Sequence, residues 1–297
     1  MLRTLYAVYN HLRLGRPYYV LPVIAAAIAG YWSGSDVSPL CANGGIVCLV
    51  FLVLGMACWT ANEITDRHSD SRGSTKMKWR IYVSGGTSIL SSGRLSVKSA
   101  VTYVVMLAMA GLAIAVLLGF TFLGLSTLFL VIGLAYSLKP VRLKERGILG
   151  LAAVALAYGV VAFTAGWVAG GHRPTAESFF FASILSVAFF GFEGLAHLLD
   201  YDQDRRNEET TLAVSLSRET ARKVLAVCQC LPALVLVLLS LFAHASVPDL
   251  NLVLLVPILF LCALMAALTT KCHEESLLGS LRVLSVPLMS VFAFLIV

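Results

Sequence analysis

Long apolar runs separated by short polar segments dominate the chain. A helix needs roughly 20 mostly apolar residues to cross the hydrocarbon core of a bilayer. Several of the runs contain Gly or Pro, which membrane helices tolerate. The pattern predicts an all-α integral membrane protein, with residues 1–297 forming a single domain. The nine expected transmembrane helices are 18–34, 44–65, 99–118, 121–138, 148–169, 178–199, 222–243, 251–270 and 277–297.

Basic residues gather at alternate ends of these spans. With the N-terminus in the cytoplasm, 21 of the 22 Lys and Arg residues fall on the cytoplasmic side, Arg282 among them, and only Arg173 falls opposite. Cytoplasmic loops of membrane proteins carry such an excess of positive charge. The asymmetry therefore predicts a cytoplasmic N-terminus and a C-terminus on the opposite side. The long loops, about 66–98 and 200–221, then lie in the cytoplasm, where we expect the active site.

The composition agrees with this topology. Hydrophobic residues make up 59% of the chain, charged residues only 13%, and the mean hydropathy is +0.86. A soluble protein of this length with such a surface would aggregate. The net charge is +6, but the basic residues lie between apolar spans rather than along one helix face. This arrangement argues against nucleic acid as a partner. The seven cysteines fall mostly inside apolar runs without metal-site spacing, as expected for packing residues.

A first group of polar side chains stands at the end of the second expected span. Asn62, Asp66 and Asp70 are spaced four residues apart in the segment NEITDRHSD, and on a helix they share one face. Acids one turn apart repel each other at the edge of a membrane. Mg²⁺ would remove that conflict, because it prefers carboxylate oxygens and often bridges them to substrate phosphates. The spacing predicts a magnesium-binding face.

A second acidic pair ends the sixth expected span. Asp200 and Asp204 again lie one turn apart, whereas Asp202 between them points elsewhere. One such pair is typical of a solvated helix end. Two pairs at matched positions on the same membrane side, each followed by basic residues, favour a shared metal site.

A basic loop follows the fourth expected span on the same side of the membrane. Acids that bind a metal beside bases that bind oxyanions are typical of a diphosphate site, where Lys and Arg neutralise the charge on the leaving group. Positive-inside charge alone is the alternative explanation for any one of these bases. The loop's candidate diphosphate-binding residues are Tyr136, Lys139, Arg142 and Lys144.

Three segments together resemble the UbiA superfamily of intramembrane prenyltransferases. NEITDRHSD matches its Asn-x-x-x-Asp-x-x-x-Asp motif, LDYDQDRRNEETTLAV its Asp-x-x-x-Asp motif and the Thr-Leu-Ala-Val that follows, and YSLKPVRLKERG its Tyr-Ser-x-x-Pro-x-Arg-x-Lys loop. Each motif alone is weak, but all three in this order on one side of nine spans are specific. The resemblance extends from about Arg16 to the C-terminus.

The resemblance implies a bundle around a central cavity, capped by the two long cytoplasmic loops. It also implies that Mg²⁺ grips the diphosphate of an allylic isoprenoid substrate, that diphosphate leaves, and that a hydrophobic acceptor captures the allylic cation. The isoprenoid tail would lie among apolar residues of the spans, the lipid bilayer surrounds the bundle, and no protein partner or nucleic acid is expected. The metal ligands that it implies are Asn62, Asp66, Asp70, Asp200 and Asp204, of which the four aspartates are the catalytic candidates.

The chain departs from the superfamily after the first motif. Many members continue with Arg-Pro-x-x-Ser-Gly, whereas this chain lacks the Arg-Pro and has a Gly-Gly pair before its Ser-Gly. Lys78 and Arg80 are the candidates for diphosphate contacts in this segment. The departure favours a menaquinone-type or secondary-metabolite enzyme over the 4-hydroxybenzoate, chlorophyll and archaeal ether-lipid subfamilies.

Three further residues leave alternatives open. Glu193 lies inside the sixth expected span, and an acid at that depth either contributes to an acceptor pocket or proton handling, or forms a hydrogen bond between helices. His197, one turn later, either shares that pocket or packs. His68 points away from the acidic face and is read as solvated.

Two reactions and one non-catalytic function compete at this point. The leading hypothesis is prenyl transfer to an aromatic or quinone-precursor acceptor. A membrane terpene cyclase would ionise the same diphosphate but capture the cation with the substrate's own double bond. A transporter would place its acids near the midplane, whereas these acids gather at one membrane edge.

Overall fold

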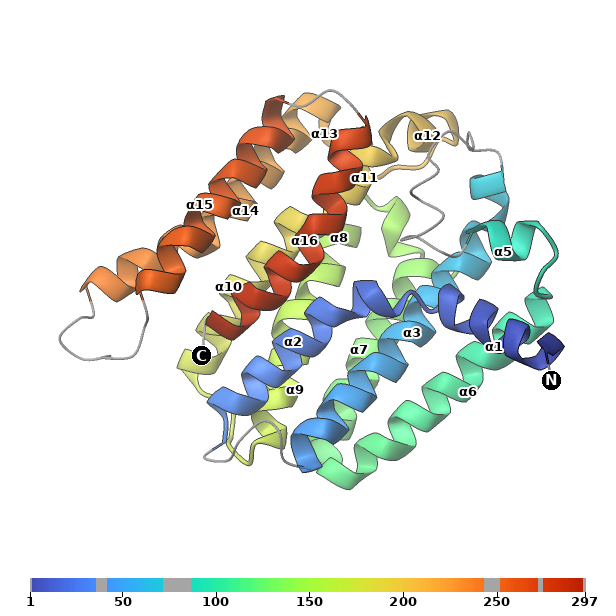
Figure 1. The fold of residues 1–297 in the computed structure, drawn as a ribbon, viewed down its shortest axis with the longest axis horizontal. Helices are drawn as coiled ribbons and strands as arrows, with labels where there is room; N and C mark the ends of the chain where they lie inside the picture. Colours follow the sequence, from blue (N-terminus) through green and yellow to red (C-terminus); the bar gives the residue numbers. More distant parts are fainter. Residues whose placement is uncertain (1, 36–41, 72–86, 243–251, 272–274, 296–297) are drawn as a thin grey trace.

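The computed structural model of the chain describes residues 2–35, 42–71, 87–242, 252–271 and 275–295. All regular elements in these residues are helices, and the long ones run mostly side by side in one bundle (Figure 1). The long helices are α1 (Leu2–Leu14), α2 (Pro17–Ser33), α3 (Ala42–Ser71), α6 (Val97–Ala115), α7 (Phe120–Ser137), α8 (Ile148–Leu156), α9 (Ala162–Ala169), α10 (Ala176–Glu193), α14 (Arg218–Phe242), α15 (Leu252–Lys271) and α16 (Glu275–Leu295). The short elements are α5 (Thr87–Ser91), α11 (Leu195–Leu199), α12 (Tyr201–Arg206), α13 (Leu212–Leu216) and the turns η1 (Val116–Leu118), η2 (Leu143–Glu145) and η3 (Ala157–Val161).

Within the described residues, seven helical stretches are long and apolar enough to cross a bilayer. Two other expected spans correspond to α2, which has 17 residues, and to α15, whose apolar part Val256–Lys271 is shorter than a full span. A multi-span helical protein is thereby confirmed, and the number nine stays a prediction. The seven stretches are Ala42–Arg67, Val97–Leu118, Phe120–Ser137, Ile148–Ala169, Ala176–Leu199, Arg218–Leu239 and Leu277–Phe294.

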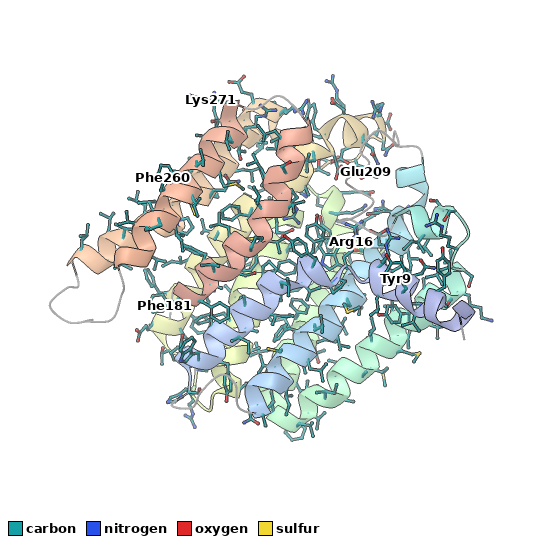
Figure 2. All side chains as sticks on the ribbon, in the orientation of Figure 1. Tyr9, Arg16, Phe181, Glu209, Phe260 and Lys271 are labelled. Atoms are coloured by element: carbon teal, nitrogen blue, oxygen red, sulfur yellow. The ribbon has the colours of Figure 1, made fainter. Side chains whose placement is uncertain are left out.

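The spans differ in how far they are buried by protein. In the span Ala42–Arg67, 61% of the most apolar window is buried inside the bundle, compared with 11% in Val97–Leu118. Helix α3 is therefore central and α6 peripheral, as their positions in Figure 1 show. Large apolar side chains lie on the outside of the bundle. Phe260 of α15, for example, points outward and is 66% exposed (Figure 2). An apolar exterior of this kind is suited to lipid rather than water.

Helices α2 and α9 pack with their backbones in contact. A methyl group at Gly30 would lie 1.9 Å from the carbonyl oxygen of Phe163, and one at Gly166 would lie 1.8 Å from that of Ala27. Small residues permit this approach, which is a common way for helices to associate in membranes, where hydrophobic burial gives little driving force. Most residues of both helices are buried, so the α2–α9 pair lies in the interior of the bundle.

Two of the expected spans are interrupted. The span expected at 148–169 contains the π-helical turn η3 between α8 and α9, and the one expected at 178–199 breaks at Gly194 between α10 and α11. In η3 the backbone N–H of Val160 donates to Oγ of Ser186, 3.1 Å away. A side-chain acceptor on the neighbouring helix thus satisfies a backbone group in the irregular turn.

Parts of the two long loops expected from the sequence are helical. Helix α3 continues to Ser71, so the first loop begins later than residue 66. The segment 200–221 contains α12 and α13 and the first turn of α14. Both acidic motifs consequently lie on or beside helices.

Candidate functional site

The first acidic motif lies on α3, as its spacing predicted. Asn62 and Asp66 lie one helical turn apart, and Asp66 is only 9% exposed. Oδ1 of Asn62 accepts a hydrogen bond of 3.1 Å from the hydroxyl of Ser137 at the end of α7. Asp70 is in the next turn of α3, but its side chain lies outside the described residues, as do Lys78 and Arg80 altogether.

The basic loop after α7 reaches the acids of α3. Nζ of Lys144 forms an ion pair with Oδ1 of Asp66, and Lys144 is 8% exposed. Nη2 of Arg142 lies 3.9 Å from the same carboxylate oxygen. Lys139 is exposed, and Tyr136 lines the cavity described below. Two of the four predicted basic-loop residues therefore face the first acidic motif.

The second acidic motif lies where α11 gives way to α12. Asp200 precedes the first residue of α12, and the backbone N–H of Asp204 donates to its carbonyl oxygen, 2.8 Å away. The side chain of Asp204 is buried and accepts a 2.9 Å hydrogen bond from the hydroxyl of Thr211. Asp202 is exposed and pairs with Arg218 at 3.6 Å. The sequence correctly separated Asp202 from the other two.

Backbone and side-chain contacts join the two motifs through the basic loop. The N–H of Gly147 donates to the carbonyl oxygen of Thr210 over 2.6 Å, and Arg142 approaches Glu209 to 3.9 Å. Because Arg142 also approaches Asp66, one guanidinium lies between the helix of the first motif and the segment of the second. The three segments named in the sequence meet at one end of the bundle.

Two carboxyl groups at this end, those of Asp204 and Glu209, have raised pKa values. Burial, and next the charge of Asp200, raise the pKa of Asp204 to about 8. Burial also raises the pKa of Glu209. Among the described side chains, no three His, Cys, Asp or Glu residues are close enough to hold a metal ion unaided. Buried carboxylates with raised pKa values are nevertheless the donors that a divalent cation would stabilise, so the residues fit Mg²⁺ that is also bound by substrate oxygens.

A cavity extends from this end into the bundle. Asn62, Tyr136 and Ser137 line it beside the acidic motifs, and Phe129 lies seven residues before Tyr136 on α7, about 10 Å deeper. The wall is therefore polar near the acids and aromatic further in. The other lining residues are Cys58, Trp59, Ile132, Gly133, Val154, Ala157, Tyr158 and Glu193.

The cavity wall contains an ion pair that the sequence did not indicate. Glu193 accepts hydrogen bonds of 3.0 and 2.5 Å from the two terminal nitrogens of Arg282, and both residues are less than a tenth exposed. The sequence grouped Arg282 with the loop bases, but it lies inside α16. A single Arg in an apolar span, with an acid available on another span, was the signal that could have revealed this pair.

The predicted histidines differ in what the structure describes. His197 is buried, and its Nδ1 accepts a 3.3 Å hydrogen bond from the backbone N–H of Leu212. It thereby fastens α11 to α13, which favours packing over a place in the pocket. The side chain of His68 lies outside the described residues.

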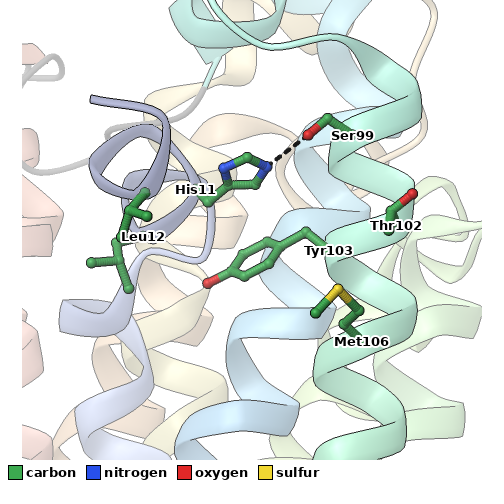
Figure 3. A pocket seen from close by; sticks show the side chains of 7 residues that line it. His11, Leu12, Ser99, Thr102, Tyr103 and Met106 are labelled. Carbon is green, nitrogen blue, oxygen red and sulfur yellow. Dashed lines mark hydrogen bonds between the residues drawn. The ribbon is translucent and has the colours of Figure 1, made fainter. Parts of the chain in front are cut away.

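A second, open groove lies between α1 and α6 (Figure 3). Nε2 of His11 accepts a hydrogen bond of 2.9 Å from the hydroxyl of Ser99, because Nδ1 already donates to the carbonyl oxygen of Ala7. Val8, Tyr103 and Met106 are among the residues that line the groove. It contains none of the predicted site residues.

Comparison with known proteins places the chain among membrane enzymes. A protein-family model described as the UbiA prenyltransferase family matches residues 19–279. The bacteriochlorophyll synthase 33 kDa chain of Cereibacter sphaeroides is 30% identical over 211 residues, which are 68% of this chain. The match spans 65% of that relative's length, slightly less than two thirds.

Solved structures share the fold. A UbiA homolog from Archaeoglobus fulgidus bound to GPP and Mg²⁺ superposes with a TM-score of 0.68, at 20% identity, over 97% of this chain and 99% of that one. The same homolog bound to DMAPP and Mg²⁺ has a TM-score of 0.68 at 21% identity, over 97% and 98%. At these identities the likeness shows the fold alone.

Proposed function

The chain belongs to the UbiA prenyltransferase family, and from this premise we propose that it transfers a prenyl group from an allylic isoprenoid diphosphate to a hydrophobic acceptor. The acceptor is an aromatic compound or quinone precursor, and diphosphate is released. The site lies at the cytoplasmic face of a multi-pass membrane protein, where the basic loops gather.

The convergence of three segments at the mouth of the cavity carries this proposal. Asp66, Lys144 and Asp204 belong to segments far apart in the sequence, yet Lys144 pairs with Asp66 and its charge also acts on Asp204. Carboxylates alone would repel a diphosphate, and a site that bound diphosphate through basic residues alone would need no carboxylates. Both together suit a substrate that arrives with a divalent cation.

Asn62, Asp66, Asp70, Asp200 and Asp204 would hold Mg²⁺. When bound there, Mg²⁺ withdraws electron density from the diphosphate and makes it a better leaving group. The homolog structures with Mg²⁺ and either GPP or DMAPP support, by analogy, the binding of an isoprenoid diphosphate together with Mg²⁺.

The chain's own residues orient the substrate and neutralise charge. Lys144 and Arg142 lie next to the carboxylates and can turn to the diphosphate oxygens as negative charge grows on them. The apolar side chains lining the cavity keep water away from the allylic carbon once its bond to oxygen breaks. Water exclusion favours capture by the acceptor over hydrolysis.

The comparisons favour transfer over the cyclisation that the sequence left open, since the matched family is one of prenyltransferases. The two reactions share the ionisation step and differ in what captures the cation. Product analysis after incubation with GPP alone separates them, because only a cyclase forms a cyclic terpene without an added acceptor.

The proposal is tested by Mg²⁺-dependent release of diphosphate from GPP or DMAPP in lipid nanodiscs, with 2-naphthol added as a simple aromatic acceptor. We expect Asp66→Asn and Asp200→Asn each to lower this release at least a hundredfold, because each removes an anionic metal ligand. Asp202→Asn is the matched control, since Asp202 lies between the motif acids in sequence but faces solvent. Near-normal release from either motif variant would refute the metal assignment, as would loss of release from the control.

A further inference from the structure

The inner end of the cavity contains polar groups that the ionisation step does not require. Tyr158 and Glu193 line it, and Trp59 lines the cavity about one turn deeper than Asn62 on α3. The indole N–H of Trp59 is buried and has no hydrogen-bond partner among the described residues. The hydroxyl of Tyr158 makes no hydrogen bond to the part of the chain that the structure describes. Apolar side chains would suffice if this end only held an isoprenoid tail.

Tyr158 owes its position to the irregular turn η3. A π-helical turn displaces a residue from the regular helical path and is frequent at functional sites. The turn is anchored where Ser186 accepts the hydrogen bond from Val160. The ring of Tyr158 stacks on Phe129, with centroids 6.0 Å apart and planes inclined by 26°, and meets Phe189 edge-on at 5.6 Å. These contacts hold the ring in one orientation at the cavity wall.

Glu193 is paired with Arg282. The guanidinium donates two hydrogen bonds to it and stacks on Tyr19 at 5.1 Å from the ring centroid. This bidentate pairing fixes the direction of the Glu193 carboxyl group. Glu193 also lines the cavity, so its carboxylate borders the space open to a ligand. The two donors and this acceptor are borne by different helices around one aromatic space.

We propose that this inner end is a recognition site for the hydroxyl of an aromatic acceptor, with Glu193 accepting its hydrogen bond, and Tyr158 and Trp59 donating to its oxygen. Arg282 is a positioning residue, because it acts only through Glu193. An aryl hydroxyl bound to a carboxylate gains electron density on its ring, which makes the ring a better nucleophile towards the allylic cation. The inference rests on the proposed function and specifies the residues that select the acceptor.

Binding of a simple probe tests the recognition site. The full chain in nanodiscs is equilibrated with 2-naphthol or with 2-methoxynaphthalene, which lacks the O–H, and empty nanodiscs give the lipid background. We expect the protein to bind 2-naphthol roughly tenfold tighter or more, because the ether leaves Glu193 without its hydrogen bond. Equal binding of the two probes, or binding of neither, would overturn the proposal.

Conservative variants identify the residues responsible. Glu193→Gln and Tyr158→Phe preserve shape and should each remove most of the preference for 2-naphthol. Arg282→Lys retains one hydrogen bond and should reduce the preference less. Tyr103→Phe, in the groove between α1 and α6, should leave it unchanged (Figure 3). If Glu193→Gln and Tyr158→Phe both kept the full preference, the assignment would be wrong.

Diphosphate release separates this proposal from the function on which it rests. Release is measured in the parent chain with GPP, Mg²⁺ and 2-naphthol as acceptor, and monodisperse elution in size-exclusion chromatography shows that all four variants fold. A protein that discriminates between the probes but releases no diphosphate would retain the recognition site and lose the proposed function. The reverse result would retain the function and exclude the recognition site.

Discussion

Replacing Arg282 with leucine should destabilise the protein more than most single substitutions. Arg282 and Glu193 are 5% and 7% exposed and share two hydrogen bonds of 3.0 and 2.5 Å. Arg282→Leu is close in length but leaves the carboxylate of Glu193 without its counter-ion among apolar side chains. A carboxylate in such surroundings must either stay charged at high cost or take up a proton.

The magnitude follows from the burial of both partners. Removing one member of a buried ion pair costs about 3–5 kcal/mol, and the lost stacking of the guanidinium on Tyr19 contributes about 1 kcal/mol. Replacing both members with apolar residues is often close to neutral. The double variant Glu193→Leu/Arg282→Leu should therefore recover most of the stability lost by Arg282→Leu alone.

Unfolding of the purified chain in mixed micelles, with denaturing detergent as the titrant, measures these differences. Lys223→Leu serves as the control, because Lys223 and Glu219 form an exposed pair one turn apart whose loss should leave stability unchanged. The reasoning fails if Arg282→Leu unfolds within about 1 kcal/mol of the parent chain. It also fails if the double variant is no more stable than Arg282→Leu.

Two further predictions concern the acidic site and the helix packing. Burial raises the pKa of Asp204 to about 8, so without metal its carboxyl is largely protonated at neutral pH. Mg²⁺ must displace this proton, and its affinity should therefore rise up to about tenfold per pH unit between pH 6 and 8. Calorimetric titration with Mg²⁺ and GPP measures this, and Asp204→Asn should flatten the rise; a flat profile in the parent chain would contradict it. Gly166→Ala should prevent accumulation of folded protein in membranes, since the added methyl would lie 1.8 Å from a backbone oxygen of α2. Gly124→Ala has open space and should accumulate normally on a membrane immunoblot, so equal yields would exclude the steric argument.

The arrangement of the helices could be predicted from the sequence because lipid imposes simple rules. Apolar runs of membrane-spanning length correspond to most of the observed spans, and the spacing of Asn62, Asp66 and Asp70 follows one face of α3. Helical periodicity also separated Asp202 from its neighbours. These features depend on local pattern alone.

The parts that could not be predicted depend on contacts between distant residues. The sequence alone assigned Arg282 to a cytoplasmic loop, whereas the structure pairs it with Glu193 of α10. The turn η3 has no signature in its residues AYGVV, and its stability depends on Ser186 of another helix. The helix break at Gly194 also has no signature in the sequence, because glycine is common inside membrane helices. The proposed acceptor site is built from these features, so the sequence suggested Glu193 without its partners.

The hydrogen bond from Gly147 to Thr210 has a consequence for how this enzyme can diverge. It joins two main chains, so substitution of neighbouring side chains does not remove it. Gly147 itself is restricted, since its φ is 59° and a methyl group there would lie 2.7 Å from Oγ of Ser215. If Gly147 is retained, the residues around it can change while the distance between the two loops is preserved. Descendants of this chain could acquire new substrates through such changes without rebuilding the scaffold beneath them.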